Sequence, residues 1–223
     1  MPEIKERPIL FSAPMVRAIL EGRKTVTRRA VKGSGLNFLA NFTPEYVALP
    51  ENHFCPYGKP GDRLWVRETW WQAGDWQATY PEDDTGAWFG SQRVVYSADG
   101  TPPNEPNTSY PNGLRNGAYS AAAPNKIWRH RPSIHMNRWA SRILLEITAV
   151  CVERLHGISE AQALAEGIYS DPVVNGMYTA DGDNYTSKQD GPSRAFADLW
   201  KSTGGDWEAN PWVWVVEFKR VTT

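Results

Sequence analysis

The sequence is poor in cysteine and has no long apolar run. Its 223 residues contain two cysteines, Cys55 and Cys151, which are too few and too far apart for a disulfide framework, so we expect a reducing, cytoplasmic setting. No apolar run reaches the roughly 18 residues that a membrane-spanning helix needs, and residues 1–7 lack the apolar core of a signal peptide. We therefore expect a cytoplasmic protein without a membrane partner.

An excess of charge of either sign is also missing. Lys and Arg number 24, Asp and Glu number 25, and the formal net charge is −1, so a surface for nucleic acid has to be a local patch. Eleven tryptophans and a hydrophobic fraction of 41% supply enough apolar area for a packed core. A wholly disordered chain is thereby excluded.

Patterns that bind metals are lacking as well. His53 and Cys55 are close in sequence, but the three later histidines do not follow zinc-ligand spacing and no cysteine pair accompanies them. The segment Asp181–Asn184 resembles the start of a calcium loop, yet the downstream glutamate is missing, and a surface turn is expected. We expect no metal and no cofactor.

Regular elements are expected mainly in the first and last thirds of the chain. Apolar periodicity, capping residues and turn residues predict helices that begin after Ser12 and Ser159 and a third around Phe196. Alternation and β-branched residues predict strands, at residues 7–11, 63–68, 143–155 and 212–219. The mixture indicates a single α+β domain over residues 1–223, built as a small mixed β-barrel, closed or nearly closed, with flanking short helices.

Two loop insertions are expected between these elements. Residues 71–138 are rich in Pro, Asn and Gly, which oppose long regular elements, and only 93–96 reads as a strand. Residues 169–192 form a second polar stretch rich in Gly, Asp and Asn. We expect both to be irregular segments attached to the main domain.

The segment Gly22–Arg29 concentrates reactive side chains just after a predicted helix end. Crowded positive charge and partial burial both depress a lysine pKa, and a neutral lysine beside a threonine hydroxyl can form a base–nucleophile pair. The alternative is a solvated basic strand that contacts phosphate or nothing. The residues concerned are Arg23, Lys24, Thr25, Thr27, Arg28 and Arg29.

The run Ile19–Arg29, with Gly61-Asp62-Arg63-Leu64 before a strand and Glu217-Phe218 near the end, resembles the ASCH family of PUA-like domains. The similarity is to a longer branch that is common in phages and prophages, and it covers residues 8–30, 59–70, 140–168 and 194–221. Both insertions stay uncovered. The resemblance implies a small mixed β-barrel whose flanking helices border a cleft.

Small ASCH enzymes that hydrolyse 4-acetylcytidine resemble the chain at this motif, which implies a catalytic set of Lys24, Thr27 and Glu166. Thr27 would attack the acyl carbon, Lys24 would take its proton, and Glu166 would hold Lys24 or protonate the leaving amine. Arg28 stands where those enzymes carry an apolar residue. In a regular strand Lys24 and Thr27 would face opposite sides, so the preceding turn has to bring them together.

Other ASCH proteins bind or cleave RNA, which gives the alternatives of a ribonuclease or of a non-catalytic module for RNA or single-stranded nucleic acid. In such a module the cations would hold phosphates and tryptophans would stack on unpaired bases. The predicted substrate-binding cations of the segment are Arg23, Arg28 and Arg29, and the predicted stacking residues are Trp70, Trp71 and Trp139.

A third polar cluster, in residues 131–142, provides Ser133, His135 and Arg138 as further candidates for the substrate pocket. Ser133 and His135 would point the same way in an extended segment, but no third group that could orient a Ser–His pair is visible. The alternative role of this cluster is to anchor the insertion. Glu68 is the alternative to Glu166 as the acidic residue, or else it pairs with an arginine. The sequence leaves the oligomeric state open.

Overall fold

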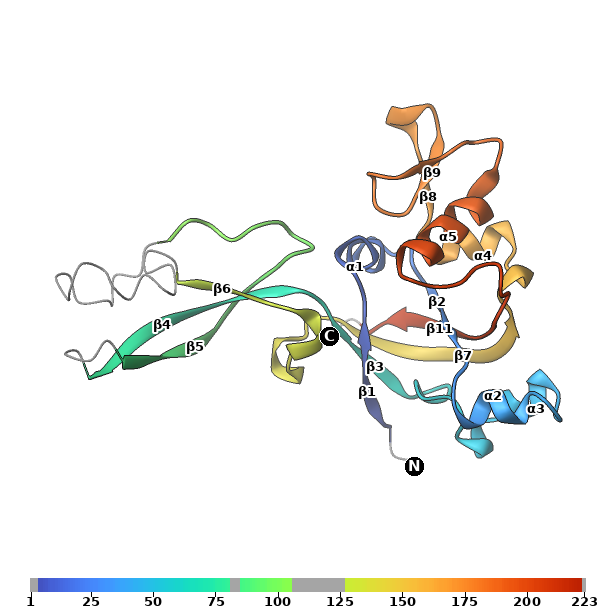
Figure 1. Cartoon of the computed structure of the whole chain (residues 1–223), viewed down its shortest axis with the longest axis horizontal. Helices are drawn as coiled ribbons and strands as arrows, with labels where there is room; N and C mark the ends of the chain where they lie inside the picture. Colours follow the sequence, from blue (N-terminus) through green and yellow to red (C-terminus); the bar gives the residue numbers. More distant parts are fainter. Residues whose placement is uncertain (1–3, 81–84, 106–126, 222–223) are drawn as a thin grey trace. The chain divides into compact units, whose positions relative to one another are not determined.

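The computed structural model describes residues 4–80, 85–105 and 127–221, with side chains except at 75–80 and 85–87. It confirms an α+β protein, whose described strands form three separate sheets (Figure 1). The chain divides into two compact units, one of residues 1–9, 14–66 and 142–223 and one of residues 10–13 and 67–141. The first expected insertion falls within the second unit, and the second insertion lies in the first unit.

The largest sheet has five strands in the order β1-β3-β7-β11-β2. The strands predicted from alternation are confirmed, with bounds that differ by at most one residue at either end. This sheet is open, with β1 and β2 at its two edges, so the described strands do not close into a barrel. The strands are β1 (Glu6–Leu10), β2 (Val26–Ala30), β3 (Arg63–Arg67), β7 (Leu144–Arg154) and β11 (Trp212–Arg220).

Three of the helices follow the predicted signals. The capping box forms as expected, because Ser159 Oγ accepts from Gln162 N at 3.2 Å and Gln162 Oε1 accepts from Ser159 N at 2.9 Å. Gly22 follows the first helix with φ 77°, a conformation in which glycine has no Cβ to clash. The helices are α1 (Ala13–Leu20), α4 (Glu160–Ala165) and α5 (Gly191–Ser202), with two unpredicted short helices, α2 (Ser34–Phe38) and α3 (Pro44–Ala48).

Helices cover both faces of the five-stranded sheet (Figure 1). On one face, α2 approaches so closely that a Cβ on Gly35 would lie 3.2 Å from the ring of Trp214. On the other face, the Arg28 guanidinium carbon lies 6.0 Å from the ring centroid of Phe196 in α5. Because side chains alternate along a strand, neighbouring residues of β2 point into different layers.

The second unit is built on a three-stranded antiparallel sheet in the order β5-β4-β6. Its strands are β4 (Trp70–Tyr80), β5 (Thr85–Tyr96) and β6 (Trp128–Arg131). The expectation of an irregular segment with one strand at 93–96 is therefore wrong for the described part of residues 71–138. Gly74 and Gly90 pair across β4 and β5 in the sheet.

The range 169–192 is likewise more regular than expected. It contains a small antiparallel sheet of β8 (Tyr169–Asp171), β9 (Met177–Thr179) and β10 (Tyr185–Thr186). Most of the proline-rich stretch of the first insertion lies outside the described residues. In the part of the chain that is described, no helix has the length and apolar character needed to cross a bilayer.

Candidate functional site

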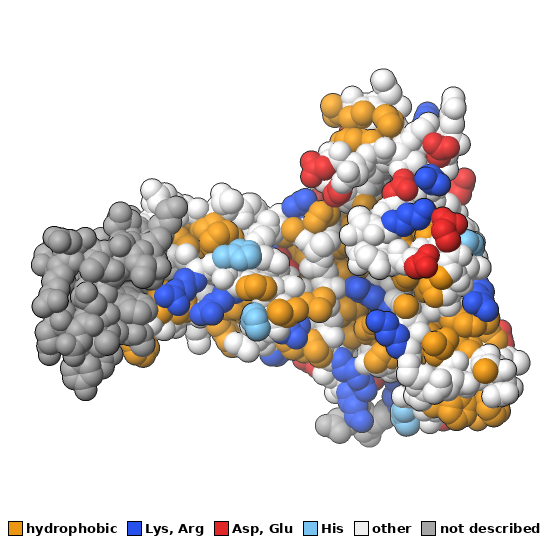
Figure 2. Space-filling model, in the orientation of Figure 1, with side chains coloured by type: hydrophobic (Ala, Val, Ile, Leu, Met, Phe, Trp, Pro, Cys, Tyr) orange, Lys and Arg blue, Asp and Glu red, His pale blue; other side chains and the backbone are white. Residues whose placement is uncertain are grey.

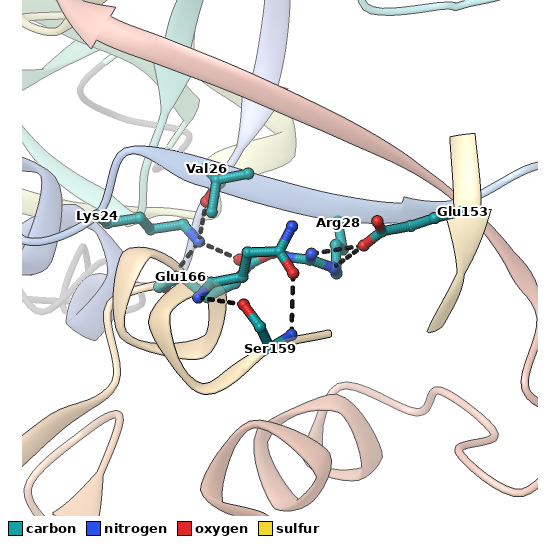
Figure 3. A network of polar contacts seen from close by, with 7 residues as sticks. Lys24, Val26, Arg28, Glu153, Ser159 and Glu166 are labelled. Carbon is teal, nitrogen blue, oxygen red and sulfur yellow. Dashed lines mark hydrogen bonds and ion pairs between the residues drawn. The ribbon is translucent and has the colours of Figure 1, made fainter. Parts of the chain in front are cut away.

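Lys24 lies at the centre of a buried polar cluster in the first unit. It precedes β2, where its backbone N–H donates to Ala18 at the end of α1, and its side chain is only 2% exposed. Lys24 Nζ donates to Val26 O at 2.8 Å, to Glu166 O at 2.8 Å and to Glu166 Oε2 at 2.6 Å (Figure 3). These contacts join the start of β2 to the end of α4.

Glu166 is shared between two cations. This residue ends α4, is 3% exposed, and accepts from Arg28 Nη1 at 3.3 Å as well as from Lys24. Arg28 has a fully buried side chain and also donates to Glu153 Oε1, from Nη2 at 2.6 Å and from Nε at 3.1 Å (Figure 3). Two cations thus face two carboxylates, and the cluster is formally neutral.

The state of Lys24 follows from this enclosure. Burial lowers the pKa of Lys24 below its ordinary value; the adjacent carboxylate of Glu166 opposes that shift, while Arg29 and Arg28 add to it. An ammonium has three N–H donors, and the three hydrogen bonds described for Nζ engage all of them. In this geometry Lys24 acts as a hydrogen-bond donor. To accept a proton as a base, it would have to lose one of these three hydrogen bonds.

Thr27 is not joined to Lys24 by any hydrogen bond among the described residues. It lies inside β2, opposite Val216 of β11, and is 3% exposed. Since Arg28 reaches Glu166 and Glu153 on one face of the sheet, alternation directs Thr27 and Arg29 to the other face. The base–nucleophile pair expected from the motif is therefore not formed in this structure, whereas the expected Lys24–Glu166 contact is present.

Arg23 lies on the rim of a separate cavity. Its guanidinium donates to Glu21 and, from Nη1, to Gly167 O at 2.9 Å, and it stacks 4.5 Å from the ring centroid of Tyr169. These side chains line a cavity of about 250 Å³ together with Asp181 and others. Arg23 thus remains a candidate for contact with a ligand, while the buried side chain of Arg28 cannot reach a phosphate from solvent.

Glu68, Ser133, His135 and Arg138 all belong to the second unit. Glu68 is 1% exposed, and its backbone N–H points to the sulfur of Met136. Ser133 and His135 lie in a 3₁₀ turn, Ser133–His135, so the extended segment that would have aligned their side chains is absent there. The Ser133 carbonyl accepts from Arg67 Nε at 3.1 Å, which ties this turn to the end of β3. His135 and Arg138 are exposed.

Two features of the site were not predicted. Glu153 lies on the same sheet face as Arg28, which the alternation of the strand at 143–155 could have indicated. The second is a set of aromatic and cationic side chains on the β4–β6 sheet.

Within the described ranges, no group of three or more His, Cys, Asp or Glu side chains is arranged to hold a metal ion.

The predicted stacking tryptophans differ in exposure. Trp70 is 2% exposed and packs with Met136 and Ala140, so it is a core residue. Trp139 is 48% exposed and meets the ring of Trp70 edge-on at 5.6 Å. Trp71 is half-buried and lies edge-on against His130, with ring centroids 4.9 Å apart.

Neither a family model, nor a curated protein, nor a solved structure was found to match the chain.

Proposed function

We propose that this protein binds single-stranded nucleic acid through the β4–β6 sheet of its second unit. The observation that carries the proposal is a cavity of about 420 Å³ that two tryptophans, Trp71 and Trp128, line together with residues 101–104. This volume is in the range typical of small-molecule pockets. Aromatic walls suit a nucleobase because every base has a π-face, which also makes stacking tolerant of sequence.

Strand register places the two tryptophans on one face of the sheet. Trp71 pairs with His130, and Ala73 pairs with Trp128, so Trp71, His130 and Trp128 point the same way. The opposite face carries Trp70, which is covered by Met136 and Ala140. The cavity therefore lies on the face of the sheet opposite to the core formed by Trp70, Met136 and Ala140.

Cations accompany these aromatic rings, as a binding surface for phosphates requires. On the face of the cavity, Arg93 lies 4.9 Å from the ring centroid of Trp128 and pairs with Glu105. On the opposite face, which carries Trp70, Arg129 and Arg131 lie 4.6 and 4.9 Å from the ring centroid of Trp88. Both arginines of this pair belong to β6, an edge strand of the sheet. Figure 2 shows blue and pale-blue side chains among orange ones over this sheet. Such a mixture favours single strands, whose bases are free to stack.

The resemblance to ASCH proteins, some of which bind RNA, does not cover residues 71–138, so the proposal for the β4–β6 sheet is independent of it. At the finer level of fold, we propose a PUA-like ASCH domain in the first unit. It is supported by the contact between Lys24 and Glu166, which the resemblance implies across 142 residues of sequence. A cytoplasmic location is part of the proposal, since both cysteines are unpaired.

Fluorescence anisotropy with labelled oligonucleotides tests the binding function. The wild type is expected to bind single-stranded RNA or DNA more tightly than a duplex, with affinity that falls as salt rises. Trp71→Ala is expected to weaken binding by roughly 5- to 100-fold, the value of one stacked base. Trp207→Ala, a half-buried tryptophan of the first unit, serves as the matched control. Binding that is equal in both variants, or absent in the wild type, rules out this surface.

A second candidate function is hydrolysis of an acylated base such as 4-acetylcytidine. The buried Lys24–Glu166 pair, at 2.6 Å, is the observation that favours it, because the resemblance assigns both residues to the reaction. Thr27 lies on the other face of the sheet, so a Thr27 nucleophile would need the start of β2 to rearrange.

Release of acetate from 4-acetylcytidine measures this activity. We expect Lys24→Ala, Thr27→Ala and Glu166→Ala each to abolish it if all three residues act as the resemblance implies. Loss with Lys24→Ala and Glu166→Ala but not with Thr27→Ala would exclude Thr27 as nucleophile. No release from the wild type would eliminate this substrate.

A further inference from the structure

A third cavity, of about 230 Å³, lies in the first unit and is unlike the tryptophan-lined one. Charged side chains gather on one side of it, contributed by the N-terminal strand and by the turn before β3. His53 and mainly apolar residues form the rest of the wall. The charged residues are Lys5, Arg7, Lys59 and Asp62, and the apolar ones include Leu49, Phe54 and Val150.

Strand register places this cavity on a defined face of the sheet. Val150 of β7 lies opposite Val216 of β11, and Val216 lies opposite Thr27 of β2. Thr27 and Val150 therefore point to the same face, and the Lys24–Glu166 cluster lies on the other one. The cavity is thus distinct from the buried ion cluster.

Positive charge exceeds negative charge around this cavity. The three cations face one carboxylate, Asp62, which is 3% exposed and accepts from Arg7 Nη1 at 2.8 Å. Lys5 and Lys59 form no ion pair with any described carboxylate, so two positive charges remain. Burial raises the pKa of the Cys55 thiol, which keeps this wall residue neutral near neutral pH. An anionic group entering the cavity therefore meets net attraction.

The charged side of the cavity is held in place by the backbone. Asp62 accepts from the backbone N–H of Lys5 at 3.1 Å and from that of Lys59 at 3.3 Å, which fixes the two segments beside each other. A Cβ at Gly58 would lie 2.7 Å from both Arg7 Nη1 and Asp62 Oδ2, so only glycine leaves room for this pair. The arrangement is preorganised, which reduces the entropic cost of binding.

We propose that this cavity binds a phosphate monoester with a compact, apolar or aromatic body. The phosphate lies between Lys5, Arg7 and Lys59, whose ammonium and guanidinium groups are the usual partners of phosphate oxygens. The body packs against Leu49, Phe54 and the other apolar wall residues. A nucleoside monophosphate has this combination of charge and planar apolar surface. This proposal is independent of nucleic-acid binding by the second unit.

Isothermal titration calorimetry of the full chain at low salt tests the proposal. The probes are adenosine 5′-monophosphate, adenosine, a hexose 6-phosphate and inorganic phosphate. We expect the nucleoside monophosphate to bind most tightly and adenosine not to bind detectably. Lys59→Gln and Lys5→Gln should each weaken binding of the monophosphate by roughly tenfold, as expected for loss of one charged contact. Lys59→Arg should keep most of the affinity, and Lys188→Gln, an exposed lysine elsewhere, should leave it unchanged.

Three outcomes would overturn the proposal. The first is absence of binding by the monophosphate, and the second is equal binding by the wild type and both Lys→Gln variants. The third is equal affinity for the nucleoside monophosphate and for the hexose phosphate or inorganic phosphate. The apolar wall would then make no contribution to the choice of ligand. Trp71→Ala should not change the titration, which separates this site from the surface proposed in the second unit.

Discussion

At the scale of single residues, the best-defined feature is the buried pair of Lys24 and Glu166, which Arg28 and Glu153 complete. Three of these charged groups are out of water, while the Glu153 side chain is 26% exposed. Burying the three is costly, and mutual pairing offsets that cost only while every partner is present. The cluster also ties the end of α4 to β2 and β7. Its first consequence is therefore structural, whichever chemistry it supports.

Removing one partner of this pair should be strongly destabilising. Lys24→Met and Glu166→Gln are each expected to lower the free energy of unfolding by roughly 3–5 kcal/mol. Glu166→Gln leaves the buried Lys24 without a carboxylate, and Lys24→Met leaves Glu166 only its longer contact with Arg28 at 3.3 Å. The double variant should cost less than the sum. Urea unfolding followed by tryptophan fluorescence measures these values. Glu21→Gln, which breaks the exposed pair with Arg23, is the control and should cost less than about 1 kcal/mol. Equal losses in the buried and the exposed pair would refute this interpretation.

Asp62 predicts how stability depends on acid. Burial works against its charge, but hydrogen bonds from Lys5, Arg7 and Lys59 outweigh burial and hold the pKa of Asp62 below its ordinary value of 3.8. A depressed carboxyl pKa contributes stability that is fully present above the unfolded value and is lost as pH falls through the folded one. We therefore expect protonation of Asp62 to lower the stability of the wild type only below about pH 4.

Asp62→Asn separates this effect from general acid denaturation. At pH 7 the variant should be less stable by about 2 kcal/mol, the typical value of a charged hydrogen-bonded group. Below pH 4 its unfolding free energy should fall less steeply than that of the wild type. Urea midpoints measured from pH 2.5 to 7 would show the two curves converging in acid. Parallel curves over the whole range would mean that Asp62 keeps an ordinary pKa.

At the scale of elements, prediction from sequence failed for β4 and β5, where Gly74 lies within the sheet. A Cβ at Gly74 would collide with the Phe89 carbonyl oxygen and with the ring of Trp88. The glycine is needed because an indole occupies that space, a reason that local turn preference cannot reveal. Apart from residues 93–96, β4 and β5 were expected to be irregular, although they form the longest hairpin in the described chain.

Gly74→Ala should therefore destabilise the hairpin. The clash involves a backbone oxygen, which cannot move aside easily, so a loss of roughly 1–3 kcal/mol is expected, as for an overpacked core. Gly157→Ala is the matched control, because a Cβ there meets nothing within 4 Å and the backbone is not left-handed. Thermal or urea unfolding measures both variants. A Gly74→Ala protein as stable as the control would show that Trp88 lies elsewhere.

Elements with strong local signals were predicted well. The capping box at Ser159 and the alternating strand before it each depend on neighbours in sequence, so local patterns were sufficient. The Lys24–Glu166 contact came from a family resemblance, because nothing local links residues so far apart. The position of Thr27 depends on how β2 leaves the turn, and the second sheet depends on long-range pairing of 128–131 with β4. Neither could be derived from the chain alone.

At the scale of the whole molecule, the two units offer different chemistry. The first contains a balanced, buried ion cluster and a cationic cavity, whereas the second presents tryptophans and arginines on an open sheet. The formal net charge of −1 does not reveal this difference between the two units, because cations gather locally while the total charge stays near zero. We propose that nucleic acid binds to the second unit.

Hydrogen–deuterium exchange of the full chain, with and without a single-stranded oligonucleotide, tests that claim most directly. We expect the oligonucleotide to slow exchange in β6, in the first residues of β4 and in residues 101–105. The segment Lys24–Ala30 should exchange at an unchanged rate. Protection confined to Lys24–Ala30 and α4, or no protection anywhere, would contradict the account.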